Sequence, residues 1–172
     1  MKLFPLFLII LFYPAVVYGV SSAPSGTIFL KGEDFPVEQK AELACVDSGT
    51  CIQFNEEIRK TIRIVLSAPL GEQTLRLEIE VPATIGAHKL KLDKDGDPRP
   101  GEKFQLEIYG SNAPVDKVVY TLEDIGDDAM VNITDISEEQ RSLNATFSGK
   151  FFDAATGVKR AQVNGTILIN GY

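Results

Sequence analysis

The chain has 172 residues, of which 44% are hydrophobic and 24% are charged, and its formal net charge is −7. This length suits one folded domain with a sizeable core. The negative balance argues against nucleic acid or anionic lipid as the main partner, because both require a basic surface. We interpret the excess of carboxylates as a source of solubility.

The first 19 residues have the order of a cleavable secretory signal peptide. Lys2 is followed by an apolar run over residues 3–12 and then by small residues up to Gly19, where we expect cleavage. The run is shorter than the roughly 20 residues that span a bilayer, and Pro5 and Pro14 interrupt the segment. We therefore expect a secreted or periplasmic protein, with no membrane insertion after cleavage.

The mature chain, residues 20–172, is expected to form a single domain. It keeps 153 residues, and its net charge moves to −8 because one lysine leaves with the signal. No linker or low-complexity tract divides it.

Alternation of apolar and polar residues dominates this mature chain. The clearest case is residues 74–81, where every second side chain is apolar, as in a strand with one buried face. Turn residues such as Asp95-Gly96 and Pro100-Gly101 separate the segments. Further strands are predicted at residues 26–30, 61–66, 89–92, 103–108, 118–122, 131–134, 143–149 and 166–169.

These strands predict an antiparallel all-β fold. Their spacing favours a β-sandwich, immunoglobulin-like or jelly-roll-like, of about 8–10 strands. The two helix-like windows, residues 37–44 and 55–60, are too short to organise a fold. We expect the first and last strands to form the open edges of the sheet, where partners can pair.

The chain contains two cysteines, Cys45 and Cys51, with five residues between them. In an exported protein an isolated pair predicts a disulfide, here one that closes a short loop. Two other roles are disfavoured, because a redox-active pair is normally two residues apart and a metal site requires more ligands.

Asp93, Asp95 and Asp97 place carboxylates at alternate positions, as at the start of a calcium-binding loop. The motif then breaks, because Pro98 stands where the helical-loop motif has glycine, although Glu102 could fold back as a further ligand. The alternative is an acidic hairpin tip that joins the strands at residues 89–92 and 103–108. Calcium is thus a candidate ligand, and no other cofactor is predicted.

The sequence contains few residue patterns that are typical of a catalytic site. A second acidic cluster, formed by Glu123, Asp124, Asp127 and Asp128, lies in a predicted turn and is interpreted as solvated. His88 is the only histidine, and no nucleophile-elbow pattern accompanies it. We therefore expect a protein that is not an enzyme.

Three Asn-x-Thr triplets begin at Asn132, Asn144 and Asn164. They are glycan acceptors in a eukaryotic secretory protein and incidental in other organisms.

The last third of the chain resembles small exported bacterial β proteins of unknown function. The resemblance lies in residues 131–134, 144–151 and 153–157 and in the final Asn-Gly strand at residues 164–169. It covers about 40 residues and contains no catalytic residue. It implies export and a β-sandwich fold.

A second resemblance is to chaperone–usher fimbrial subunits. The strand at residues 26–33 and the terminal aromatic Tyr172 carry it. It implies an incomplete sandwich that a neighbouring subunit completes with a donated strand. The short spacing of Cys45 and Cys51 departs from that family, whose disulfide usually spans some tens of residues.

Together these features favour an exported, non-catalytic interaction module of the cell envelope or extracellular space whose partner is a protein. Two alternatives stay open: a fimbrial-type subunit assembling by strand exchange, and a calcium-stabilised secreted module. The sequence does not determine the partner or the oligomeric state.

Overall fold

The structure, a computed structural model, describes residues 25–45, 51–56, 60–92, 99–111, 117–123, 127–153 and 155–171. The predicted signal peptide lies outside these ranges. Eleven strands occur in the described part, and no helix does. They are β1 (Gly26–Lys31), β2 (Gln39–Cys45), β3 (Ile52–Asn55), β4 (Thr61–Leu70), β5 (Gln73–Pro82), β6 (Gly86–Leu90), β7 (Lys103–Tyr109), β8 (Lys117–Thr121), β9 (Asp128–Ser137), β10 (Ser142–Phe152) and β11 (Lys159–Ile169).

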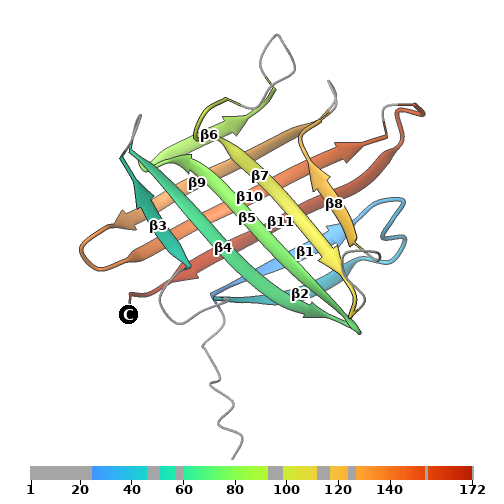
Figure 1. The fold of residues 1–172 in the computed structure, drawn as a ribbon, viewed down its shortest axis with the longest axis horizontal. Helices are drawn as coiled ribbons and strands as arrows, with labels where there is room; N and C mark the ends of the chain where they lie inside the picture. Colours follow the sequence, from blue (N-terminus) through green and yellow to red (C-terminus); the bar gives the residue numbers. More distant parts are fainter. Residues whose placement is uncertain are drawn as a thin grey trace, which may run out of the picture.

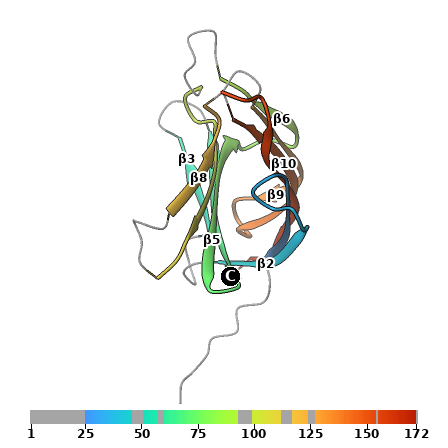
Figure 2. The ribbon, with the colours of Figure 1, turned by 90° about the vertical axis from the view of Figure 1, so that its right-hand side faces the viewer.

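All paired strands are antiparallel and form one sheet in the order β6-β9-β10-β11-β1-β2-β4-β5-β7-β8, with β3 also paired to β4. The sheet folds over on itself, so that a first half (β6, β9, β10, β11, β1, β2) faces a second half (β3, β4, β5, β7, β8). Figures 1 and 2 show the two layers and the steep angle at which their strands cross. The predicted antiparallel all-β class is confirmed, and the architecture is an open half-barrel.

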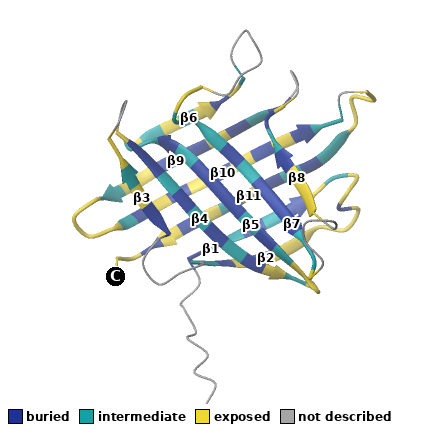
Figure 3. Cartoon of the chain, in the orientation of Figure 1, coloured by how far each residue is buried: buried dark blue, intermediate teal, exposed yellow. Residues whose placement is uncertain are grey.

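Among the described strands, the two halves are joined along the sheet where β2 meets β4, through the pairs Ala44↔Ser67 and Cys45↔Leu66. Apolar side chains that face each other across the interior also hold the two halves together. Figure 3 shows the resulting alternation of buried and exposed positions along β9, β10 and β11. Such alternation is what a strand with one buried face requires.

Aromatic side chains bridge the halves inside this core. Phe104 of β7 lies with its ring centroid 6.2 Å from that of Phe147 and 5.8 Å from that of Phe151, both in β10. All three side chains are nearly inaccessible to solvent. Burial of one such side chain contributes roughly 1.5–3 kcal/mol to folding, so these contacts stabilise the packing of the second half on the first.

Two predicted details of the secondary structure are wrong. The helix-like window at residues 37–44 is occupied mainly by β2, and the eleven strands of the described part exceed the expected range. The window at residues 55–60 lies partly outside the described residues. Helix-favouring residues in β2 adopt strand geometry because that segment pairs with β1 on one side and reaches β4 on the other. Tertiary pairing here overrides local propensity.

The predicted edges are also wrong. β1 and β11 pair with each other over six residue pairs, from Gly26↔Ile167 to Lys31↔Gln162. β1 pairs on its other side with β2, and β11 with β10. The first and last strands are therefore interior, and the path of the sheet ends instead at β6 and β8.

The hairpin interpretation of the acidic loop is wrong for a related reason. β6 pairs with β9 in the first half, whereas β7 pairs with β5 and β8 in the second half. The chain between these two strands therefore connects the two layers and does not turn back along one strand pair.

Candidate functional site

The predicted calcium ligands Asp93, Asp95 and Asp97 lie outside the described residues. Glu102, the further ligand considered for that loop, is described and has an interaction partner. Within the described ranges, no three His, Cys, Asp or Glu side chains are grouped so that they could hold a metal ion. The calcium prediction therefore stays a prediction.

The second acidic cluster contains a carboxylate with a structural role. Asp127 is 7% exposed and accepts hydrogen bonds from the backbone N–H of Phe152 at 2.8 Å and of Glu123 at 3.2 Å. It thereby ties the start of β9 to the end of β10. Asp128 is the first residue of β9, opposite Lys150, and Asp124 lies outside the described part.

His88 lies in the edge strand β6. Its Nε2 is 2.8 Å from the carbonyl oxygen of Thr84, to which a protonated Nε2 donates. This contact orients the ring along its own chain segment.

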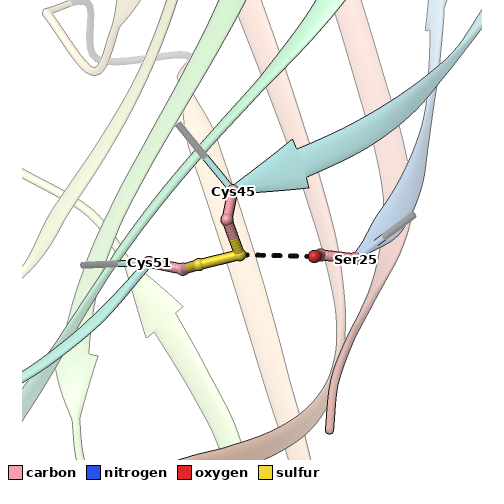
Figure 4. The surroundings of a disulfide bond; sticks show 3 residues. All are labelled: Ser25, Cys45 and Cys51. Carbon is pink, nitrogen blue, oxygen red and sulfur yellow. Dashed lines mark hydrogen bonds between the residues drawn. A yellow bond between two sulfur atoms is a disulfide. The ribbon is translucent and has the colours of Figure 1, made fainter. Parts of the chain in front are cut away.

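The predicted disulfide between Cys45 and Cys51 is confirmed. It lies where the chain passes from the first half to the second, and Figure 4 shows the Oγ of Ser25 directed at the Sγ of Cys45, 3.3 Å away. The pairing with β4 is continuous across this point. Cys45 pairs with Leu66, the carbonyl of Cys51 accepts from the N–H of Val65 at 3.0 Å, and Ile52 pairs with Ile64.

β2 and β3 are therefore two parts of one ladder along β4. The disulfide joins Cys45, the last residue of β2, to Cys51, which directly precedes β3. A disulfide at this position stabilises the junction of β2, β3 and β4 without disturbing the pairing of β2 and β3 with β4.

The outer face of the second half carries a network of ion pairs. Glu78, with 7% of its side chain exposed, lies 3.0 Å from both Arg63 and Lys103 and 3.1 Å from Arg76. Burial acts to raise the pKa of Glu78, but the hydrogen bonds from Arg63 and Lys103 outweigh it and hold the pKa below its usual value. With its partners in place, this carboxylate serves to hold β4, β5 and β7 in register.

Glu107 on β7 is held in the same way. Its Oε1 lies 2.7 Å from the Nζ of Lys117, and its Oε2 lies 3.5 Å from Arg76. Burial acts to raise the pKa of Glu107, but the hydrogen bond and charge of Lys117, together with Gln105 and Arg76, outweigh it and hold the pKa below its usual value. Lys117, the only charged residue of β8, is thereby engaged within its own molecule.

The inner side of β8 is tethered to the first half through Tyr120. The Tyr120 hydroxyl donates to Asp34 at 2.9 Å, and Asp34 also pairs with Arg160 at 3.2 Å. The rings of Phe35 and Phe151 lie against Tyr120, with centroid distances of 6.0 and 5.8 Å. Burial and the Asp34 carboxylate raise the pKa of Tyr120 far above its ordinary value, so this phenol is a hydrogen-bond donor that fixes β8 in place.

The outward edge of β8 has no strand against it in the described part of the chain. β8 pairs only with β7, and no backbone hydrogen bond from a described turn or loop reaches its residues. Val118 and Val119 are each 39% exposed, one on each face of the strand. β8 thus presents backbone groups and apolar side chains together.

The edges at β6 and β3 are protected by comparison. β6 carries an exposed Lys89 and begins at Gly86, which has a positive φ of 130°. β3 has only four residues, and the Nζ of Lys60 lies 5.7 Å from the ring of its Phe54. Charged residues, irregular backbone and short length are the usual means of protecting a sheet edge. β8 is also short, with five residues, but its one charged residue, Lys117, is engaged with Glu107.

Two further features of the surface give weaker indications of function than the edge at β8. A polar hollow of about 400 Å³ lies beside the ends of β10 and β11, lined in part by Asp135, Gln140 and Asn144. Asn144 and Asn164, two of the candidate glycan acceptors, are exposed on β10 and β11, and Asn132 is half-buried on β9. Their glycosylation stays a prediction.

Sequence reasoning placed a strand at residues 118–122 but missed its edge position. No local signal could have revealed it, because an edge is defined by which distant strand is absent from one side.

Within the described ranges no helix is long and apolar enough to cross a membrane.

Comparisons with protein-family models, with curated proteins and with solved structures found no match to this chain. The fold defines the class: an antiparallel all-β protein with one disulfide, in whose described part no strand lies against the outward edge of β8.

Proposed function

We propose that the protein is an exported, non-catalytic interaction module that binds a protein partner by strand addition at β8. The observation that carries this proposal is the edge at β8: among the described strands β8 has a ladder partner on one side only, and two half-exposed valines flank its backbone. An extended segment added there gains main-chain hydrogen bonds, and its alternate side chains contact the exposed valines.

The architecture supports binding at an edge over binding in a cavity. The inner faces of both halves form one continuous apolar cluster, as in the β-sandwich class that we propose for the domain. The outer face of the second half is occupied by its own ion pairs. In the described part of the chain, the edge of the sheet is thus where backbone groups without a partner strand are found.

Export is part of the proposal. It is supported by the signal-like residues 1–19 and by the Cys45–Cys51 disulfide, a bond that forms and persists in oxidising compartments. Secretion and a periplasmic location both fit these features.

The fimbrial alternative requires a strand that leaves one molecule to complete another. In this protein the first strand, β1, is paired on both sides within its own chain. That arrangement supports pairing at β8 over exchange of the N-terminal strand.

The test is site-specific photo-crosslinking in native envelope extract or culture fluid. A photoreactive residue at position 119 is expected to give a defined crosslinked species. The same residue at Val158, which is 43% exposed in the turn between β10 and β11, is expected to give none. Equal products from positions 119 and 158, or none from 119, contradict the proposal.

A further inference from the structure

The residues of β8 are arranged so that the strand can pair with itself. The strand reads Lys117-Val118-Val119-Tyr120-Thr121. Lys117, Val119 and Thr121 lie on the outer face, and Val118 and Tyr120 lie on the inner face, opposite the buried Ile108 and Leu106 of β7.

We propose that the partner at β8 is a second copy of this chain, whose β8 pairs antiparallel about a two-fold axis at Val119. This inference rests on the proposed function and names the partner. Two-fold dimers are the commonest closed assemblies, and they use the same surface patch on both copies.

The two faces of the sheet fix which registers are allowed. Directly opposite residues of an antiparallel pair lie on the same face, so outer residues must oppose outer residues. Only an axis that passes through a residue satisfies this condition. With the axis at Val119 all five residues are paired: Val119 with Val119 of the other copy, Val118 with Tyr120, and Lys117 with Thr121.

The charges of the strand favour this arrangement over the parallel one. Lys117 is the only charged residue of β8, and in the antiparallel pair it opposes a threonine. In a parallel pair in register, each Lys117 would face its copy, and like charges directly opposite one another are destabilising. Each Lys117 also keeps its own Glu107, 2.7 Å away.

The pairing would cover the surfaces that the single molecule leaves exposed. The two Val119 side chains meet on the outer face, and each Val118 lies against the other copy's Tyr120 on the inner face. Tyr120 is already held by Asp34 and packed against Phe35, so the strand is ordered before the second copy arrives. Such preorganisation reduces the entropic cost of association.

Cysteine crosslinking tests the register directly. Both native cysteines are in the disulfide, so a new cysteine is the only free thiol. Opposed residues of an antiparallel pair lie about 4.5–5.5 Å apart between Cα atoms, within the roughly 4.4–6.8 Å range of disulfides. Mild oxidation of the mature V119C protein is expected to give a covalent dimer. The V118C and V158C variants are the matched controls and are expected to form no covalent dimer.

Sedimentation velocity of the mature wild-type protein supplies the second readout. We expect concentration-dependent dimerisation that V119K abolishes and V158K retains, with unfolding free energies of both variants within about 0.5 kcal/mol of the wild type. A monomer at all concentrations, or crosslinking through V118C in place of V119C, overturns the inference. If the protein does not dimerise but a different protein is crosslinked from position 119, the proposed function stands and the dimer is rejected. If neither dimerisation nor crosslinking is observed, both proposals are rejected.

Discussion

The continuous ladder of β2 and β3 along β4 makes an unusual prediction about the disulfide. The double variant C45A/C51A should fold but lose stability, because the bond restrains the unfolded chain. Deletion of residues 46–50 in the same background should then restore stability, because the two flanking positions become consecutive in one strand.

The magnitudes follow from the geometry. Cys45 and Cys51 are six positions apart, and closing a loop of that size is worth about 2 kcal/mol in the chain-entropy relation. Their Cα atoms lie 5.2 Å apart, against about 3.8 Å for consecutive residues. Joining them therefore requires a closure of only about 1.4 Å, and most of the lost stability should return.

Urea unfolding followed by circular dichroism measures both steps. We expect the midpoint of C45A/C51A to fall below that of the wild type, with an unchanged m-value, and the midpoint of the deletion variant to lie between them. Wild-type protein with its disulfide reduced is the control for loss of the sulfur atoms. A deletion variant that is unfolded, or less stable than C45A/C51A, would refute the single-ladder account.

Three further predictions concern the core and the charge network. E78Q should destabilise the protein by about 1–3 kcal/mol. Because the pKa of Glu78 is lowered by folding, its contribution is present above about pH 4.3 and lost as the pH falls through the lowered value; acid unfolding should therefore be less steep in E78Q. Y120F removes the bond to Asp34 and should cost about 1 kcal/mol in urea unfolding, and no change would contradict the tether. G165A should cost about 1–3 kcal/mol in thermal unfolding, because a Cβ there meets the Thr27 carbonyl and the Phe147 ring; a wild-type melting temperature would contradict that packing.

Local patterning was sufficient to predict most strands. Segments such as residues 74–81 and 143–149 alternate strictly, and each lies within an observed strand, β5 or β10. Their inward side chains are buried because one face of each strand packs on the opposite half. The disulfide was predictable as well, since an isolated pair of cysteines has few other roles.

Long-range pairing was not predictable from the same patterns. β1 and β11 are separated by most of the chain, yet they are neighbours in the sheet. Nothing in residues 26–30 indicates that β11 is the partner strand, because any strand can supply the backbone hydrogen bonds that β1 forms. The predicted edges failed for that reason, and the edge at β8 could be found only from the topology.

Amide hydrogen exchange in β8 tests the central claim, that this edge is open in the isolated molecule. At low protein concentration we predict alternation along residues 117–121: amides that bond to β7 exchange slowly, and those that point away exchange as fast as unstructured amides. At high concentration the second group should also become protected as copies pair. Slow exchange of all five amides at low concentration would show that the molecule covers this edge itself and would contradict the account.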